Sequence, residues 1–303
     1  MTTTIRIGTR DSELALWQAH TVQNHLESLG YKTTLVPVKS TGDIVLDKPL
    51  YELGITGIFT KTLDVAMLNG DIDIAVHSMK DVPTALPKGI VEAAILERAN
   101  VQDILVHKGL DFLDATGTIA TGSLRRQAQW LHRYPAHTVV DLRGNVNTRM
   151  QKLNDNDWNG AIFAAAGLER INLKPDNFID LDWMIPAPAQ GAMLVVAKKE
   201  DKFCLEALAN LNHKSSEICV HIEREFLREL EGGCTAPIGA LAKIENDTIR
   251  FNGALFSLDG KQKIDIRKEI NVSEQEGFGK ACAKEILENG GRELMKKIKA
   301  EIQ

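Results

Sequence analysis

The sequence predicts an α/β protein made of two lobes, followed by a smaller α+β domain. Over residues 4–98, short apolar runs typical of strands alternate with amphipathic patterns typical of helices, and the same alternation recurs over residues 99–191. From about residue 215 the order changes to one helix, three strands and a final helix. The chain has 303 residues, and domains of about 150 residues would divide it into two or three.

The first lobe is predicted to start with a strand over residues 4–9 and a helix over 13–29 that Gly30 terminates. Further strands are expected over 33–38 and 72–76, with a helix over about 59–68 between them. In a parallel or mixed sheet of this kind, ligands are expected at the carboxyl ends of the strands. The loops after these strands contain Arg10 and Ser12, then Asp43, and finally Lys80 and Asp81.

The second lobe is predicted to contain strands over residues 103–107, 118–121, 138–142 and 160–165. Ser123 is the expected cap of a helix that begins at Leu124 and ends before Pro135, and a further helix follows the strand over 138–142. The strand exits again carry cations, namely Arg125, Arg126, Arg143, Arg149 and Arg170.

Arg125 and Arg126 lie in the first turn of their helix, where the helix dipole disfavours a cation by about 0.3–1 kcal/mol. A pair of arginines at this place therefore indicates a nearby anion. Guanidinium groups bind carboxylate or phosphate through paired hydrogen bonds, each contributing about 1.5–3 kcal/mol. The alternative for any single arginine is a solvated loop residue. Seven cations in loops or helix starts favour an anionic ligand: Arg10, Lys80, Arg125, Arg126, Arg143, Arg149 and Arg170.

Residues 186–191, which contain two prolines and end in Gly191, predict a crossover hinge into a strand over 193–197 that can return to the first sheet. In the third domain, strands are expected over about 239–244, 248–256 and 261–270, with a single helix over 273–302. We therefore expect three domains, formed by residues 1–98 with 192–213, by 99–191 and by 214–303.

Composition excludes several classes of function. The formal net charge of −5 argues against a nucleic-acid-binding protein, which would be expected to be basic. No apolar run is long enough to span a membrane, and the amino terminus lacks the apolar segment of a signal peptide. The four cysteines show no metal-binding spacing and indicate free thiols in a reducing cytoplasm. No phosphate-binding loop or GxGxxG motif is present.

Cys234 lies in a short turn after an amphipathic helix in which apolar residues recur every four positions from Ile218 to Leu230. Glycines end that helix, and Pro237 prevents it from resuming. A small, half-buried cysteine in a tight turn is one interpretation. A catalytic thiol usually has a positioned histidine, which the local sequence does not offer. If Cys234 has a function, a permanent attachment point therefore fits better than a turnover nucleophile.

Asp81 is an acidic residue at a strand exit, where most of the other charged residues are cations. A carboxylate beside Lys80 in a positive cleft is expected to stay ionised, to accept N–H donors or to stabilise a developing cation. The alternative is an aspartate that opens the turn before Val82 and Pro83. His77, inside the preceding strand, is expected to be a packed, hydrogen-bonded residue in preference to a catalyst.

Five motifs, in order along nearly the whole chain, resemble the porphobilinogen deaminase (hydroxymethylbilane synthase) family. The resemblance implies that the first two lobes are built like type II periplasmic binding proteins, beside a smaller α+β carboxyl-terminal domain. The motifs are Arg10-Asp11-Ser12 with Leu14-Ala15-Leu16-Trp17-Gln18-Ala19, His77-Ser78-Met79-Lys80-Asp81-Val82-Pro83, Ser123-Leu124-Arg125-Arg126, Leu142-Arg143-Gly144-Asn145 and Glu231-Gly232-Gly233-Cys234.

The resemblance also implies a reaction. Such enzymes are transferases of tetrapyrrole and haem biosynthesis, which deaminate porphobilinogen and join four molecules head to tail into the linear tetrapyrrole hydroxymethylbilane. The chain grows on a covalently bound dipyrromethane primer. Each pyrrole carries an acetate and a propionate, which fits the many arginines. No metal is implied, and porphobilinogen is the expected small-molecule partner of a cytoplasmic monomer that binds neither nucleic acid nor membrane.

Individual roles follow from the same resemblance. Asp81 is the catalytic residue, which holds pyrrole N–H groups and stabilises an azafulvenium-like cation, and Cys234 carries dipyrromethane through a thioether. The implied cofactor-binding residues are Asp43, Lys80, Asp81, Thr121, Ser123, Arg125, Arg126, Arg143 and Gly144. The implied substrate-binding residues are Arg10, Ser12, Gln18, Arg143, Arg149, Arg170 and Gln190.

Two positions depart from the family pattern. Thr56 stands where the family often has lysine, and Gly122 stands where a hydroxyl residue is usual. A second hypothesis, from another class, is a two-lobed anion-binding or sensing protein without chemistry. The missing secretion signal and the additional cysteine-bearing domain argue against it.

Overall fold

The computed structural model describes residues 3–38, 60–231 and 236–302, which divide between two compact units. The first unit contains the described residues 3–38, 60–99 and 191–217, and the second contains 100–190, 218–231 and 236–302. Three residues singled out above, Asp43, Thr56 and Cys234, lie outside the described residues. The division into three domains stays a prediction, because the contacts separate two units.

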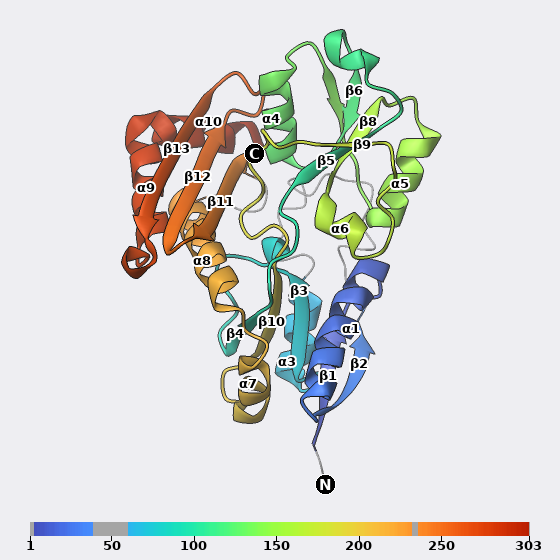
Figure 1. Ribbon diagram of the computed structural model, residues 1–303, viewed down its shortest axis with the longest axis vertical. Helices are drawn as coiled ribbons and strands as arrows, with labels where there is room; N and C mark the ends of the chain where they lie inside the picture. The colour runs from blue at the N-terminus through green and yellow to red at the C-terminus, as the bar shows by residue number, and fades with distance from the viewer. Residues whose placement is uncertain (1–2, 39–59, 232–235, 303) are drawn as a thin grey trace. The chain divides into compact units, whose positions relative to one another are not determined.

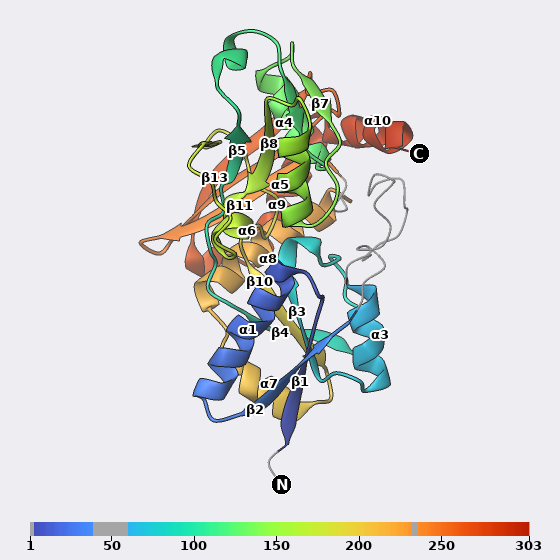
Figure 2. The ribbon, with the colours of Figure 1, turned by 90° about the vertical axis from the view of Figure 1, so that its right-hand side faces the viewer.

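The first unit is a five-stranded mixed sheet covered by helices on both faces. Strand β1 pairs in parallel with β2 and β3, whereas β10 runs antiparallel to β3 and β4. Helices α1 and α7 pack on one face, and α3 lies on the other (Figure 2). The strand order is β2 (Lys32–Pro37), β1 (Thr4–Thr9), β3 (Ile74–Ser78), β10 (Met193–Lys198) and β4 (Ile90–Ile95), with helices α1 (Glu13–Ser28), α3 (Lys61–Asn69) and α7 (Lys202–Ala209).

The expected return of residues 193–197 to the first sheet is confirmed, because β10 is inserted between β3 and β4. Its residues Met193 to Ala197 are all buried, as a central strand covered on both faces requires. Strand β4 and helix α7, by contrast, were not predicted. A strand from residues 193–198, after the whole second sheet in sequence, thus completes the sheet that the first residues begin.

The second unit contains a sheet of the same arrangement (Figure 1). Strand β6 pairs in parallel with β7 and β8, and β5 runs antiparallel to β8 and β9. Alternate residues of β5 face opposite layers, with Ile104 and Val106 in one core and Leu105 in the other. The order is β7 (Thr138–Val140), β6 (Thr118–Ala120), β8 (Gly160–Ala164), β5 (Asp103–His107) and β9 (Phe178–Asp180), covered by α4 (Leu124–Arg133), α5 (Val146–Asp155) and α6 (Ala165–Glu169).

The remainder of the second unit is a three-stranded antiparallel sheet with helices packed against it. Phe251 of the central strand contacts Phe226 and Phe278, with ring centroids 5.1 and 5.9 Å apart. No helix of the described residues is long and apolar enough to cross a bilayer. The elements are β11 (Ile238–Glu245), β12 (Thr248–Phe256), β13 (Lys263–Asn271), α8 (Lys214–Glu229), α9 (Phe278–Ile286) and α10 (Arg292–Ile302).

The prediction of one uninterrupted helix over residues 273–302 is wrong. The helical pattern is broken at Asn289 and Gly290, where Gly290 adopts the left-handed φ of +99°. A left-handed residue cannot continue a right-handed helix, and glycine adopts it at little cost. The break lets α9 and α10 both direct apolar side chains, including Ile286 and Leu294, into the core of the three-stranded sheet.

Glu223 of α8 connects this core to the hinge segment that precedes β10. Its side chain is fully buried, and its two oxygens accept the backbone N–H groups of Ala189 and Ala242, each at 2.7 Å. Ala189 has a left-handed φ of +62°, a conformation that costs an alanine about 1–2 kcal/mol. The carboxylate therefore stabilises a strained residue of the hinge.

Glu223→Gln is expected to lower the free energy of unfolding by about 1–3 kcal/mol, because the new amide NH2 faces a buried N–H in place of an acceptor. Urea denaturation followed by circular dichroism measures the change. Glu229→Gln on the same helix is the control, since Glu229 pairs with the exposed Lys280 at 3.9 Å and surface pairs of this kind contribute little. Equal stability of the two variants would contradict this role of Glu223.

Candidate active site

In the first unit, the parallel pairing of β1 and β3 brings the loops after both strands to the same sheet edge. Arg10 and Ser12 follow β1, and Lys80 and Asp81 lie in a short 3-10 turn, η2 (Met79–Asp81), after β3. All four residues are half-buried. The structure thus brings together the first-lobe cations and the aspartate, as the pattern of strand ends indicates.

Hydrogen bonds fix the turn that carries Asp81. Gln18 of α1 is buried, and its Nε2 donates to Ser78 Oγ at 2.9 Å, directly before the turn. The Met79 N–H donates to the Ala192 carbonyl at 3.0 Å, which ties the turn to the start of β10. Gln18, expected to bind substrate, here positions the end of β3.

His77 lies behind this turn and is buried. Burial, and to a lesser extent the charge of Arg10, lowers the pKa of His77 to about 4, so the ring is neutral at pH 7. It is packed as expected, but its Nε2 makes no hydrogen bond within the described part of the chain.

In the second unit, the loops after β6 and β7 meet at one edge because the two strands are parallel neighbours. Thr121 and Ser123 follow β6, and the Ser123 N–H donates to Thr121 Oγ1 at 3.3 Å. After β7, Arg149 Nε donates to the Gly144 carbonyl at 2.8 Å, which folds the loop back on α5. This edge therefore carries hydroxyl groups and guanidinium groups side by side.

Arg125 and Arg126 are both held by one buried carboxylate, Asp103. Arg125 Nη1 lies 2.7 Å from Asp103 Oδ2, and Arg126 Nε and Nη2 lie 2.9 and 2.8 Å from Oδ1. Gln190 Nε2 also donates to Oδ1, at 3.0 Å. The anion indicated by two arginines at a helix start is thus present within the protein. Two guanidinium charges share one carboxylate, which leaves an excess of positive charge.

The remaining bonds of this cluster fix the surrounding backbone. Arg125 donates to the Ile185 carbonyl at 2.8 Å, and Arg126 donates to the Ile162 carbonyl at 2.9 Å. Gln190, expected to bind substrate, is fully buried and also donates to the Val101 carbonyl at 2.8 Å. Burial lowers the pKa of Arg125, and the nearby Asp103 acts against this effect.

Arg143 differs from this pair. It is buried, and its Nη1 has no hydrogen-bond partner within the residues that the structure describes. Burial lowers the pKa of Arg143, and Asp141 opposes the shift. Burial likewise lowers the pKa of Arg170, to about 10. A buried guanidinium donor without a partner is costly. The Arg125 Nε also lacks a partner in the described residues, but Arg125 is paired with Asp103, whereas no described carboxylate forms such a pair with Arg143, so Arg143 is the stronger candidate for an external anion.

Two glycines allow the close approach of backbone segments at this edge. A Cβ at Gly122 would lie 2.7 Å from the Leu142 carbonyl oxygen, so the β6 loop passes directly over the β7 loop. Gly144 has a φ of +116°, and a Cβ there would lie 2.7 Å from Thr148 Cγ2. A side chain at position 122 would therefore press against the loop that holds Arg143, whereas glycine leaves room for it.

Sequence reasoning missed Asp103, the centre of the arginine cluster. One signal was available in the sequence: Asp103 directly precedes the apolar run Ile104-Leu105-Val106. When such a strand is covered on both faces, an aspartate at its start is buried as well. A buried carboxylate needs a cationic or hydrogen-bonding partner. The pairing itself depends on the antiparallel register of β5 and β8, in which Asp103 lies opposite Ala164.

These features define a class of protein, an α/β protein in which cations follow the ends of parallel strands, together with an α+β module. Residues 5–206 match the family described as porphobilinogen deaminase, dipyromethane cofactor binding domain, and residues 217–288 match its C-terminal domain. The chain belongs to the porphobilinogen deaminase family, whose members are hydroxymethylbilane synthases, transferases of tetrapyrrole biosynthesis with a dipyrromethane cofactor.

Curated relatives match over nearly their whole length. A porphobilinogen deaminase from Pelotomaculum thermopropionicum is 41% identical over 98% of this chain and 97% of its own, and one from Syntrophomonas wolfei is 39% identical over 96% and 97%. Among solved structures, the probable amino-acid ABC transporter extracellular-binding protein ytmK from Bacillus subtilis is 12% identical, with a TM-score of 0.45 over 70% of this chain and 90% of its own. The expected α/β class is confirmed to the extent that two five-stranded mixed sheets of the same strand arrangement are followed by a smaller three-stranded α+β part.

Proposed function

We propose that this chain deaminates porphobilinogen and joins four molecules into hydroxymethylbilane on a dipyrromethane that Cys234 carries through a thioether. The observation that carries the proposal is Arg143, a buried cation with an unpartnered Nη1 among the described residues, on a sheet edge with Thr121 and Ser123. The carboxylates of a pyrrole acetate or propionate supply the acceptor that this donor lacks.

The residues present fit a polycarboxylate cofactor. We assign the grip on its carboxylates to Arg143 and to the hydroxyl groups of Thr121 and Ser123, with Gly144 allowing close approach of the loop. Arg125 and Arg126, whose guanidinium groups are shared with Asp103, contribute the excess positive charge of their cluster. When bound, dipyrromethane supplies the pyrrole carbon to which each new unit is joined. Lys80 and Asp43 are assigned to the same cofactor by resemblance.

Asp81 is proposed as the catalytic residue. Its turn is fixed by the hydrogen bonds of Gln18 and Met79, so its carboxylate is preorganised to accept pyrrole N–H donors and to stabilise positive charge as ammonia leaves. Arg10 and Ser12 share its sheet edge and are assigned to the substrate carboxylates. Arg149, Arg170, Gln18 and Gln190 keep their proposed substrate roles, the two glutamines by positioning backbone.

We also propose that the protein is a cytoplasmic monomer without nucleic-acid partners. The described cysteines Cys204, Cys219 and Cys282 are buried, and Cys204 and Cys282 are free thiols, which suits a reducing compartment. Burial raises the pKa of Cys282 to about 11 and that of Cys204 further still. These two thiols are therefore poor nucleophiles, and Cys234 is the proposed attachment residue by resemblance.

Intact mass spectrometry tests the proposal. The purified active protein is expected to be heavier than its sequence by two porphobilinogen units less the ammonia they lose, and Cys234→Ser is expected to show the unmodified mass and no turnover. Cys204→Ala is the control and is expected to retain the added mass. Unmodified mass in an active wild-type protein contradicts the proposal, and an anion-binding protein without chemistry would show neither the added mass nor consumption of porphobilinogen.

A further inference from the structure

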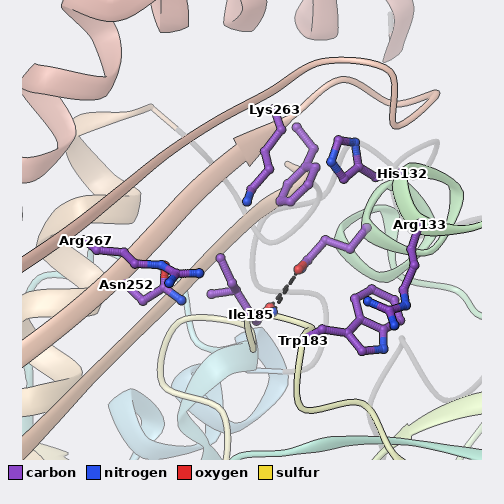
Figure 3. A pocket seen from close by; sticks show the side chains of 9 residues that line it. His132, Arg133, Trp183, Ile185, Asn252, Lys263 and Arg267 are labelled. Carbon is purple, nitrogen blue, oxygen red and sulfur yellow. Dashed lines mark hydrogen bonds between the residues drawn. The ribbon is translucent and has the colours of Figure 1, made fainter.

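We infer that the second unit carries an additional binding site, for a small aromatic anion, at the carboxyl end of α4 (Figure 3). The site is a pocket of about 320 Å3 lined by the last turns of α4, the segment after β9, and strands β12 and β13. This volume lies within the range of small-molecule sites. The lining residues that determine its chemistry are Arg133, Trp183, Ile185, Phe256, Lys263 and Arg267.

The walls of the pocket are held in place by hydrogen bonds and close packing. Gln129 Nε2 donates to the Ile185 carbonyl at 2.9 Å, and its Oε1 accepts the Ile185 N–H at 2.8 Å. His132 Nδ1 donates to the Gly260 carbonyl at 2.7 Å. A Cβ at Gly260 would lie 2.6 Å from the Ala128 carbonyl oxygen, so the β12–β13 turn packs directly on α4. The pocket is therefore preformed.

Aromatic and aliphatic side chains form its apolar surface. Trp183, Ile185 and Phe256 line the pocket together. Phe256 contacts the edge of His132, with ring centroids 5.5 Å apart, and Trp183 contacts Trp130 at 6.0 Å. Rings held by such contacts present fixed flat faces, which favour a flat ligand.

Cations surround these apolar walls. The Arg133 guanidinium carbon lies 5.0 Å from the Trp183 ring centroid, and Lys263 Nζ lies 5.9 Å from that of Phe256. Lys263 also pairs with Asp265 at 3.3 Å. Arg267 is exposed and has no hydrogen bond or ion pair within the described residues. None of the described lining residues is acidic, so the pocket is positive.

A polar group also lacks a partner at this place. Asn252, which lies opposite Arg267 in the antiparallel register of β12 and β13, lines the pocket with a buried Oδ1 that makes no hydrogen bond in the described chain. Figure 3 shows Asn252 and Arg267 side by side at one end of the pocket, and Arg133 and Trp183 at the other. The Asn252 Oδ1 is an acceptor and does not itself bind an anion, so the anionic groups are assigned to Arg267 at one end and Arg133 at the other. A ligand with a flat apolar body and an anionic group at each end matches these two positions.

The pocket lies at the opposite end of α4 from Ser123, although its lining residue Ile185 also accepts a hydrogen bond from Arg125. Ser123 caps the first turn of α4, whereas Arg133 ends the helix, and ten residues at 1.5 Å each place the two ends about 15 Å apart. Both sites can therefore be occupied at the same time. The inference goes beyond the proposed function and does not depend on it.

Isothermal titration calorimetry of the full-length holoenzyme with naphthalene-2,6-dicarboxylate tests the inference. Arg267→Gln and Arg133→Gln are each expected to weaken binding at least tenfold, because each removes a charge-assisted contact. Arg250→Gln is the matched control and is expected to bind like the wild type, since Arg250 lies on β12 but pairs with Glu245 and Glu269 at 2.7 and 3.0 Å. All three variants replace exposed side chains and are expected to fold.

Two further ligands separate the contribution of the aromatic ring from that of the two carboxylates. Octanedioate, which has two carboxylates but no ring, and naphthalene-2,6-dimethanol, which has the ring but no charge, are both expected to bind at least tenfold more weakly than the probe. Equal binding of the probe by wild type, Arg267→Gln and Arg133→Gln would place it elsewhere and overturn the inference. Octanedioate binding as tightly as the probe would overturn the aromatic part.

Discussion

Asp103→Asn is expected to lower the free energy of unfolding by about 3–5 kcal/mol, the cost of removing one partner of a buried ion pair. The carboxylate is fully buried and accepts hydrogen bonds from Arg125, Arg126 and Gln190. Asparagine removes the negative charge that Arg125 and Arg126 share and places an NH2 group among donors. Two buried guanidinium groups would then lack their counterion. Urea denaturation monitored by tryptophan fluorescence measures the effect.

The control for this experiment is Asp180→Asn. Asp180 lies on β9, directly beside β5 in the same sheet, and its side chain is exposed. The same aspartate-to-asparagine replacement can therefore be made at the surface. Its replacement is expected to change stability by less than about 0.5 kcal/mol, as surface substitutions usually do. A loss of less than 1 kcal/mol in Asp103→Asn would show that the arginine cluster does not depend on this carboxylate.

Asp81→Asn is expected to reduce porphobilinogen turnover by about 10²–10³-fold, the usual effect of removing one preorganised electrostatic group. Asparagine keeps the size and one acceptor oxygen but loses the negative charge that stabilises a developing cation. The turn is held by backbone bonds of Met79 and by Gln18, so the variant is expected to fold and to show the cofactor-loaded mass. Initial rates of porphobilinogen consumption, measured on loaded protein, give the result.

Asp71→Asn provides the comparison, because Asp71 is an exposed aspartate at the opposite end of β3. Its turnover is expected to equal that of the wild type. Wild-type rates in a fully loaded Asp81→Asn protein would remove Asp81 from the mechanism. Loss of the added mass together with turnover would instead assign Asp81 to cofactor assembly.

The sequence was most informative where local rules decide structure. The alternation of strand and helix patterns predicted four of the five strands in each of the two mixed sheets. The rule that parallel strand ends meet at one edge grouped Arg10 with Asp81, and Arg125 with Arg143. Ser123 was expected as a helix cap, and its Oγ lies 3.5 Å from the Arg126 N–H. The sequence was least informative about short breaks in a helix, such as the one at Gly290, because one left-handed residue hardly alters an amphipathic pattern.

The two arginines of α4 show the limit of reading charge along a chain. Their position at a helix start correctly indicated an anion, but a ligand and a buried side chain give the same signal. Asp103 lies 22 residues from Arg125 in sequence and reaches it only through the order of the strands. Arg143, in the same class of loop, has a buried Nη1 without a described partner, and no local pattern distinguishes it from the pair.

The sequence by itself therefore determined the fold class, the family and the set of cationic and acidic residues at the strand ends, because these follow from periodicity and motifs within short segments. Only the tertiary structure decided which cations are neutralised internally and which lack a partner. It also placed the aromatic and cationic walls of the second pocket on α4, β12 and β13. Charge pairing and burial depend on distances between segments far apart in the chain, and those distances are set by strand order and packing.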